Sequence, residues 1–443
     1  MPYQPPKHVL EVLQKIEYEE ALPDGDPRYV DTQVARGSEK TFSRLASKFG
    51  WDPESDAFFA PAQRHVLFFG HIGSGKSTEL NRYARKFDRS GRYYVVEVNV
   101  LAKLDRNNLQ YTESLLAMAE ALLERLQNDA FDPGDAALAP VREWFAQAVR
   151  THEDKKELTA EVRAGIETKS GIPGLVRLFA SLTTAFKSGA TYKTEWRTEI
   201  RNRFSDLARA FNGLIRATEA TVRNAGRAER VVFVLDGTDK LSGGDTKQFF
   251  VFDIEQLLAI EALVVYAAPL HMQYEGLLSG KLGTIMLPMI KLEEENRTPC
   301  QAGLDAVRDL LLRRADRSLF AGDTEIDRLV AACGGHPREL LRLLVLCCEY
   351  AEDAIDARTV DRAIAQLAAE YRRWLEPDDY RLLLRIDTDD LHAGYDERMR
   401  RLLYRLALME YNDGSWRRSH PVVRTLAGYL RAEPIDPAAE APP

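Results

Sequence analysis

The stretch GHIGSGKST at residues 70–78 decides the fold of this chain. It matches the phosphate-binding loop pattern G-x-x-x-x-G-K-[ST]. The apolar run before it, residues 65–69, predicts a buried strand, and residues 76–87 carry apolar side chains at helical spacing. A strand, a glycine loop and a helix in this order predict a loop that holds phosphate, rather than a glycine-rich turn that binds nothing.

Each residue type in the loop has a physical reason. Glycine allows positive φ, so successive backbone N–H groups can point inward and form a nest for an anion. The helix that begins near Lys76 adds the positive end of its dipole. Lys76 would reach the β- and γ-phosphates, and the hydroxyl of Ser77 would ligate Mg²⁺. The expected ligand-binding residues are Gly70, His71, Ile72, Gly73, Ser74, Gly75, Lys76, Ser77 and Thr78.

The composition is that of a globular protein. The chain has 443 residues, of which 45% are hydrophobic and 29% charged, and this length predicts about two to four domains. The formal net charge of −8 argues against nucleic-acid binding through overall charge. With no signal-peptide pattern, and no apolar run near the ~18 residues that span a bilayer, we expect a cytoplasmic protein. The cysteines lack metal-binding spacing and are expected to be buried free thiols: Cys300, Cys333, Cys347 and Cys348.

Four further apolar runs predict the other strands of the sheet. They lie at residues 93–100, 230–236, 262–268 and 284–291. Nearly continuous apolar strands separated by helical segments are typical of a parallel sheet with both faces covered. The sequence therefore predicts an α/β fold.

A long segment without strand signals, residues 127–229, predicts a helical insertion. It contains an apolar seam with alternating spacings of four and three: Ile200, Phe204, Leu207, Phe211 and Leu214. The outer face of this helix carries arginines: Arg201, Arg203, Arg209, Arg216 and Arg223. Because acidic residues interleave with them, we favour a solvated helix over a basic face for a partner or nucleic acid.

The C-terminal third is expected to be mostly helical. A helical bundle is predicted from segments 303–316, 324–333, 337–352 and 358–374. Beyond it come helices at 378–386 and 395–408, a hairpin turn at 412–414 and a short helix at 421–430. This order resembles a winged helix, in which the hairpin residues Arg417 and Arg418 fit packing and nucleic-acid contact equally well.

Three charged residues complete the expected site. Asp236 ends a buried strand expected beside the strand of the loop, where a carboxylate would hold the Mg²⁺ shell, although a helix cap is the alternative. Asp239 is the nearest acid that would orient an attacking water, unless Lys240 neutralises it. Arg338 follows a helix-starting proline, and an arginine there is a poor match for the helix dipole, which favours a role toward phosphate.

Other candidates depend on position alone. His271 and Gln273 follow the strand at 262–268 and would face the γ-phosphate or serve a neutral surface role. Tyr29, Val30 and Arg36 would lie beside the base, but plain packing is favoured because a base pocket has no spacing code.

The motifs together resemble the AAA+ and STAND superfamily of P-loop ATPases over residues 26–375. GHIGSGKST matches the Walker A motif, VVFVLDGTDK resembles the STAND form of Walker B and more loosely the KAP form, and CGGHPREL resembles the lid motif that carries the sensor 2 arginine. The sequence departs from this pattern where Gly237 and Lys240 replace acidic residues of relatives, which implies slow hydrolysis. No arginine finger is identified, although several basic residues lie near the right place: Lys281, Arg313, Arg314 and Arg317.

The resemblance implies an ATP-binding and ATP-hydrolysing switch with ATP and Mg²⁺ as cofactors. Such a switch oligomerises or changes conformation to control a partner protein, and a prokaryotic defence or stress system is the setting it hints at. An ATP-regulated DNA-binding protein is the alternative, and a small-molecule kinase is disfavoured because no acceptor pocket is evident. The expected parts are a lead-in at 1–64, an ATPase core at 65–300, a helical lid at 301–375, a winged-helix-like domain at 376–432 and a disordered tail at 433–443.

Overall fold

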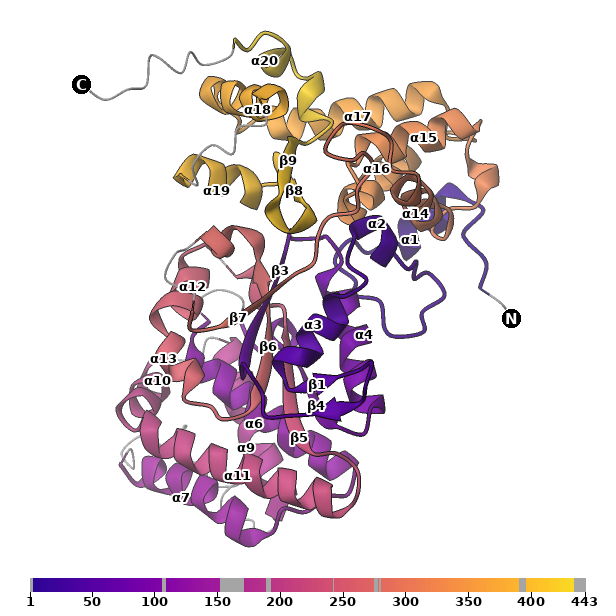
Figure 1. Cartoon of the computed structure of the whole chain (residues 1–443). Coiled ribbons are helices and arrows are strands. Elements are labelled where there is room, and N and C mark those ends of the chain that lie inside the picture. The colour runs from indigo at the N-terminus through magenta and orange to yellow at the C-terminus, as the bar shows by residue number, and fades with distance from the viewer. Residues whose placement is uncertain are drawn as a thin grey trace, which may run out of the picture.

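The computed structural model describes residues 3–105, 109–151, 171–188, 193–241, 243–274, 278, 280–389 and 396–433; the expected tail beyond 433 lies outside them. Within these residues the centre of the molecule is a five-stranded sheet of order β4-β5-β6-β3-β7, in which every pairing is parallel (Figure 1). Its strands are β3 (His65–Gly70), β4 (Tyr93–Asn99), β5 (Arg230–Asp236), β6 (Leu263–Pro269) and β7 (Gly283–Met286). The predicted parallel sheet is confirmed.

Helices cover both faces of the sheet because successive strand residues point to opposite sides. Val66 and Phe68 pack in one core with the helices α3 (Thr41–Lys48) and α4 (Lys76–Arg89). Leu67 and Phe69 lie in the opposite core, which includes residues of α6 (Tyr111–Asn128) and α11 (Phe204–Asn224). Each strand is thus buried on both sides, as its continuous apolar sequence predicts.

Two strands are shorter than the sequence predicts. The strand expected at 93–100 ends at Asn99, whose side chain accepts a hydrogen bond from the N–H of Ala102 (3.0 Å) and so begins the helix α5 (Val100–Lys103). The strand expected at 284–291 ends at Met286, shortly before Pro288, which has no N–H to donate.

The insertion is helical, as predicted. Its described helices are α7 (Asp135–Thr151), α9 (Gly171–Ser188), α10 (Lys193–Asn202) and α11. The apolar seam does not run along one helix, because the helix breaks at Arg203 between α10 and α11. Ile200 and Leu207 on either side of the break are nevertheless both buried in the same core.

The arginines of this region form ion pairs or hydrogen bonds with acidic or polar side chains. The ion pairs are Arg203–Glu199, Arg209–Asp206, Arg216–Glu261 and Arg223–Glu229. Arg201 donates a hydrogen bond to Gln110. These pairings support the interpretation of a solvated helix face.

The chain after the sheet forms a helical bundle. Its helices are α14 (Gln301–Leu312), α15 (Asp323–Ala332), α16 (Pro337–Tyr350) and α17 (Ala357–Arg372), and we call this bundle the lid. The N-terminal helix α1 (Val9–Lys15) packs against α16. The remaining short elements are α2 (Gln33–Arg36), β1 (Trp51–Asp52), β2 (Ala57–Phe58), η1 (Thr238–Lys240), α12 (Gly243–Lys247), η2 (Gln248–Phe252), α13 (Ile254–Leu258), η3 (Leu270–Tyr274) and η4 (Arg317–Leu319).

The last part of the chain contains the expected hairpin. Its elements are α18 (Pro377–Asp389), α19 (Glu397–Tyr404), β8 (Leu408–Tyr411), η5 (Asn412–Gly414), β9 (Trp416–Ser419), η6 (Val423–Thr425) and α20 (Ala427–Leu430). The turn residues have positive φ, with Asp413 at 56° and Gly414 at 94°, which explains the Asn-Asp-Gly sequence. The helix predicted at 421–430 is interrupted, because Leu426 has extended backbone between η6 and α20.

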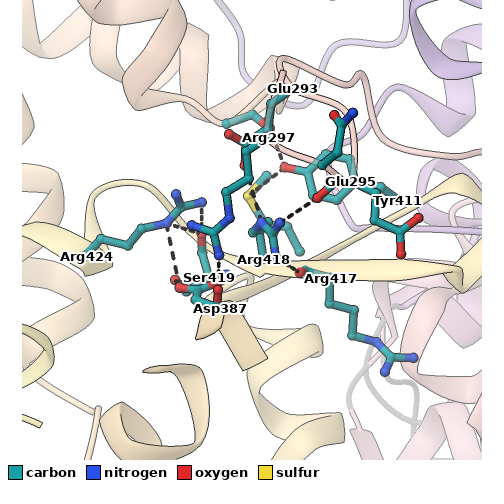
Figure 2. A network of polar contacts seen from close by, with 12 residues as sticks. Glu293, Glu295, Arg297, Asp387, Tyr411, Arg417, Arg418, Ser419 and Arg424 are labelled. Carbon is teal, nitrogen blue, oxygen red and sulfur yellow. Dashed lines mark hydrogen bonds and ion pairs between the residues drawn. The ribbon is translucent and has the colours of Figure 1, made fainter. Parts of the chain in front are cut away.

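The arginines of the hairpin are buried, and Figure 2 shows Arg418 beside Glu293 and Glu295. Arg418 is 2% exposed, donates to the carbonyl of Glu295 (2.9 Å) and pairs with Glu293. Arg417 is 4% exposed and pairs with Glu410 at 2.8 Å. The hairpin is thus bound to the connection between sheet and lid, and in this position it presents neither arginine to a nucleic acid.

The expectation about the cysteines is confirmed. All four cysteines are buried free thiols. Among the described helices, none combines the length and apolar character that crossing a membrane would require.

The close packing of Gly303 in α14 against the backbone of Lys291 leads to a prediction about stability. A Cβ on Gly303 of α14 would lie 1.6 Å from the carbonyl oxygen of Lys291, so Gly303→Ala should destabilise the protein by about 2 kcal/mol or more. The matched control is Gly213→Ala in α11, where a Cβ meets nothing within 4 Å. This control should stabilise by up to about 1 kcal/mol through helix propensity. Thermal unfolding midpoints that shift in the same direction for both variants would contradict the packing.

Candidate functional site

The loop between β3 and α4 has the conformation of an anion nest. Gly73 and Gly75 have φ of 89° and 97°, a region that side chains rarely adopt. Gly75 is the residue before the first turn of α4, and N–H groups of a first helical turn have no partner within the helix. The loop therefore offers backbone donors and a positive helix end to an anion.

Carbonyl groups of the loop accept hydrogen bonds from Lys76 within the loop and from Arg36 in the N-terminal segment. The ammonium of Lys76 donates to the carbonyls of Gly70 and His71, each at 2.9 Å. Arg36, from the N-terminal segment, is 3% exposed and donates to the carbonyl of Ser74 at 2.7 Å. These hydrogen bonds restrain the backbone of the loop.

The lid contacts the loop through His336. The N–H of Glu339 donates to Nδ1 of His336 (3.2 Å), so the proton of the neutral ring is on Nε2, which donates to the carbonyl of Ile72 at 3.0 Å. Burial lowers the pKa of His336 well below its usual value, which keeps the ring neutral. A Cβ on Gly73 would lie 2.9 Å from Cε1 of His336, so glycine is also required there for the lid to approach.

The hairpin contacts the loop through His71. The N–H of Glu410 in β8 donates to Nε2 of His71 at 2.9 Å. Burial, and secondarily the charge of Lys76, lowers the pKa of His71 to about 3. The ring is therefore neutral at ordinary pH and accepts this bond.

Lys76 is held by a buried ion pair with Asp239. Their charged atoms are 2.7 Å apart, and both side chains are almost fully buried. Burial lowers the pKa of Lys76, and the charge of Asp239 acts in the opposite direction. Lys76, not the neighbouring Lys240, is thus the cation that pairs with Asp239. The second carboxylate oxygen of Asp239, Oδ1, is buried and has no hydrogen-bond partner among the described residues.

Asp236 lies at the end of β5 and accepts a hydrogen bond from the hydroxyl of Ser77 at 2.7 Å. Burial raises the pKa of Asp236, and the charge of Asp239 adds to this effect. The prediction that its strand is beside the loop's strand is wrong, because β6 lies between β5 and β3. The helix α4 nevertheless brings Ser77 to Asp236.

These oxygens fit a magnesium ion. Mg²⁺ prefers oxygen ligands and is usually bound through one or two carboxylates together with phosphates and waters. Ser77 and Asp236 supply a hydroxyl and a carboxylate within one hydrogen bond of each other, and Asp239 adds the unpartnered oxygen. The residues predicted to hold the metal are therefore together, and metal binding itself stays a prediction.

Arg338 lies against the loop in a cavity that also contains Lys76. Its Nε would lie 2.8 Å from a Cβ on Gly73, and one guanidinium nitrogen is 3.7 Å from a carboxylate oxygen of Glu19. The cavity is lined by Lys76, Ser77, Asp239 and other residues from the core, the lid and the N-terminal segment. Its basic residues are Arg36, Lys76, Lys240, Arg314 and Arg338.

The residues predicted to lie beside a base have varied positions. Tyr29, Val30 and Arg36 all line this cavity. Arg36 donates a hydrogen bond to the loop. The guanidinium of Arg82 lies 4.0 Å from the centre of the Tyr29 ring, and the hydroxyl of Tyr29 donates to Glu79. These contacts are packing interactions around the loop, and contact of these residues with a base stays a prediction.

Residues considered for phosphate sensing have other neighbours. The ring of His271 packs edge-on against Tyr404 of α19 at 4.9 Å, and Gln273 is exposed. The arginine-finger candidates are bound within the chain: Lys281 to Glu255, Arg313 to the carbonyls of Pro27 and Tyr29, Arg314 to the carbonyls of Arg28 and Leu310, and Arg317 to Asp323.

Several contacts of the site were not anticipated from the sequence. Two are the pairing of Asp239 with Lys76 and the bond from the N–H of Glu410 to His71. The others are the bond from His336 to the loop, the bond from Arg36 to Ser74, and the pairing of Glu19 with Arg338. His336 is within the lid motif that drew attention to Arg338, so the motif gave a signal for it. Arg36 was expected beside a base rather than bonded to the loop, and Glu19 has no signal in the sequence, because both contacts depend on where the N-terminal segment crosses the loop.

Comparisons with known proteins leave the family open. No protein-family model and no curated protein matches the chain. Among solved structures, the chain is similar to the RuvB Holliday junction branch migration motor of Thermotoga maritima, with 12% identity over 94% of this chain and 99% of that chain and a TM-score of 0.36. It is also similar to Cdc6p from Pyrobaculum aerophilum, with 11% identity over 94% of this chain and 98% of that chain and a TM-score of 0.38. The Walker-type ATPase paby2304 of Pyrococcus abyssi is similar as well, with 12% identity over 92% of this chain and 99% of that chain and a TM-score of 0.37. With TM-scores this low, the likenesses carry no argument about what this chain does.

The contact between His71 and the hairpin predicts a pH dependence. Because the folded pKa of about 3 is below the ordinary value of 6.5, the unfolded chain binds the proton more tightly. The free energy of unfolding should therefore fall as the pH drops below 6.5, with His71 contributing about 1.4 kcal/mol per pH unit until about pH 3. His71→Gln keeps an acceptor for Glu410 without the titration, so its urea unfolding should depend less on pH between 7 and 5. An unchanged dependence would show that His71 is not buried as described.

Proposed function

We propose that this chain binds ATP together with Mg²⁺ and hydrolyses it slowly as a molecular switch that controls a partner protein. The observation that carries the proposal is the loop at 70–78, in which Gly73 and Gly75 have positive φ, as in an anion nest, and which the lid, the hairpin and the N-terminal segment contact. A ligand bound in this loop would contact the residues to which the lid, the hairpin and the N-terminal segment are bonded.

The charged residues would act on the phosphates. Lys76 would bind the β- and γ-phosphates, and the negative charge of the nucleotide would replace Asp239 as its partner. Asp239, once released, would have both oxygens available to orient water. Arg338 at the first turn of α16 would contact the terminal phosphate. Magnesium, held by Ser77 and Asp236, would neutralise phosphate charge.

The loop contacts supply a route from nucleotide to conformation. A ligand shifts a conformational equilibrium only if it binds two states with different affinity. Because His336 and the β8 strand are bonded directly to residues 71 and 72, a change in the loop changes the free energy of lid and hairpin docking. We propose that the altered position of the lid or hairpin exposes a surface for oligomerisation or for the partner.

The alternative of ATP-regulated DNA binding through the hairpin receives no support from this arrangement. Arg417 and Arg418 are both paired and buried. A salt-dependent gel shift tests it, because binding through phosphate contacts would weaken steeply with salt.

The nucleotide proposal has a direct test. Lys76→Ala should abolish ATP binding and phosphate release, because it removes the buried cation of the loop. Lys86→Ala removes the same charge from the same helix, where Lys86 lies over the ring of Phe42, and should leave both unchanged. Equilibrium binding and phosphate release are measured for the two variants and the wild type. Undiminished ATP binding by Lys76→Ala would refute the assignment of this loop.

The switch proposal is tested by size. We expect the mass or the hydrodynamic radius of the full chain to change on adding ATP or its non-hydrolysable analogue, because the lid and hairpin contact the loop. Light scattering after size-exclusion chromatography measures it, with Lys76→Ala as the control that should not respond. If wild-type protein binds ATP but keeps the same mass and radius, the chain is a constitutive enzyme or adaptor rather than a switch.

A further inference from the structure

The N-terminal segment crosses the cavity of the candidate site. The residues before the crossing are bound to the lid. The hydroxyl of Tyr3 donates to the carbonyl of Arg313 (2.6 Å), and the N–H of Asp316 donates to the carbonyl of Pro6 (2.8 Å). The helix α1 packs on α16. Residues 17–22 follow directly. We call them the strap.

The far end of the strap is attached to the core. The N–H of Leu22 donates to the hydroxyl of Thr78 (3.1 Å), and the carbonyl of Leu22 accepts from the side-chain amide of Asn81 (3.2 Å). Both partners are in the first two turns of α4, the helix that begins at Lys76, and Leu22 is buried. The strap therefore connects the lid to the phosphate-binding helix across the cavity between them.

The middle of the strap borders the site itself. Residues 18–22 line the cavity that contains Lys76 and Arg338, and Glu19 and Ala21 also line the adjoining cavity beside Asp236. A carboxylate oxygen of Glu19 is 3.7 Å from a guanidinium nitrogen of Arg338. Glu19 thus faces the arginine that a terminal phosphate would need.

We propose that the strap closes the nucleotide cleft, with the carboxylate of Glu19 in the place of phosphate beside Arg338, and that it must detach for ATP to enter. This inference rests on the proposed function. Two anions cannot share Arg338 without repulsion, so an arriving triphosphate competes with Glu19. The strength of the contacts fits a releasable closure, because the side chain of Glu19 is 64% exposed and such ion pairs are weak.

Two variants loosen the strap at different points. Glu19→Gln removes the charge that pairs with Arg338, and Asn81→Ala removes one of the two bonds to Leu22. Glu17→Gln is the matched control: it removes the same charge from the same segment, and Glu17 has no ion-pair partner in the described part of the chain. It accounts for the general effect of charge on association with an anion.

The experiment follows binding of a fluorescent N-methylanthraniloyl ATP to the full chain by stopped flow. We expect association to be about two- to fivefold faster for Glu19→Gln, the range that an exposed ion pair provides. For Asn81→Ala we expect about three- to tenfold faster association, from the loss of one hydrogen bond. Glu17→Gln should associate like the wild type. When all proteins are measured without nucleotide, the backbone amide of Leu22 should exchange its hydrogen faster in both loosened variants than in the wild type.

The outcomes separate the strap from the proposed function. If neither the wild type nor the two loosened variants bind the ATP analogue, nucleotide binding is refuted, and the strap proposal with it. Wild-type binding with equal association rates in Glu19→Gln, Asn81→Ala and Glu17→Gln refutes only the strap. Unchanged association with reduced phosphate release in Glu19→Gln also refutes it, since Glu19 would then act in hydrolysis rather than closure.

Discussion

The burial of the Lys76 ammonium is the constraint on which the rest of the site depends. An ammonium has three hydrogens to donate, and here two go to carbonyls of the loop and the third faces Asp239. A charge this deeply buried is costly unless it is paired and hydrogen-bonded. Asp239, which lies in η1 just after the end of β5, therefore supplies the charge that the buried ammonium needs.

The same loop is where four parts of the chain meet. Lys76 binds two of its carbonyls from within, while Arg36, His336 and the N–H of Glu410 bind it from the N-terminal segment, the lid and the hairpin. The lid and the hairpin can approach each other closely because residue 334 is glycine, since a Cβ there would meet Met409 and Pro421. A Cβ on Gly335 would meet the carbonyl of Ile290, so the lid also needs glycine to lie against the chain that follows the sheet. The lid motif thus serves as a contact between parts as well as a carrier of Arg338.

Much of the fold could be predicted from the sequence because its signals are local. The strand at 65–69, the glycine loop and the hairpin turn at 412–414 each depend on neighbouring residues and were confirmed. The prediction that β5 is the neighbour of β3 failed, because the sheet order, which places β6 between them, depends on distant partners. The sequence left open whether Arg417 and Arg418 pack or contact a nucleic acid, and acidic and carbonyl partners bury both.

The sequence by itself determined the phosphate-binding loop, the apolar strands and the helical regions that follow, because glycine, lysine and hydrophobic spacing act over a few residues. Only the tertiary structure decided that Asp239 pairs with Lys76, that His336 and Glu410 reach the loop, and that Glu19 faces Arg338. These contacts join residues far apart in the chain. Their existence follows from how the sheet, lid and N-terminal segment pack, which no local pattern encodes.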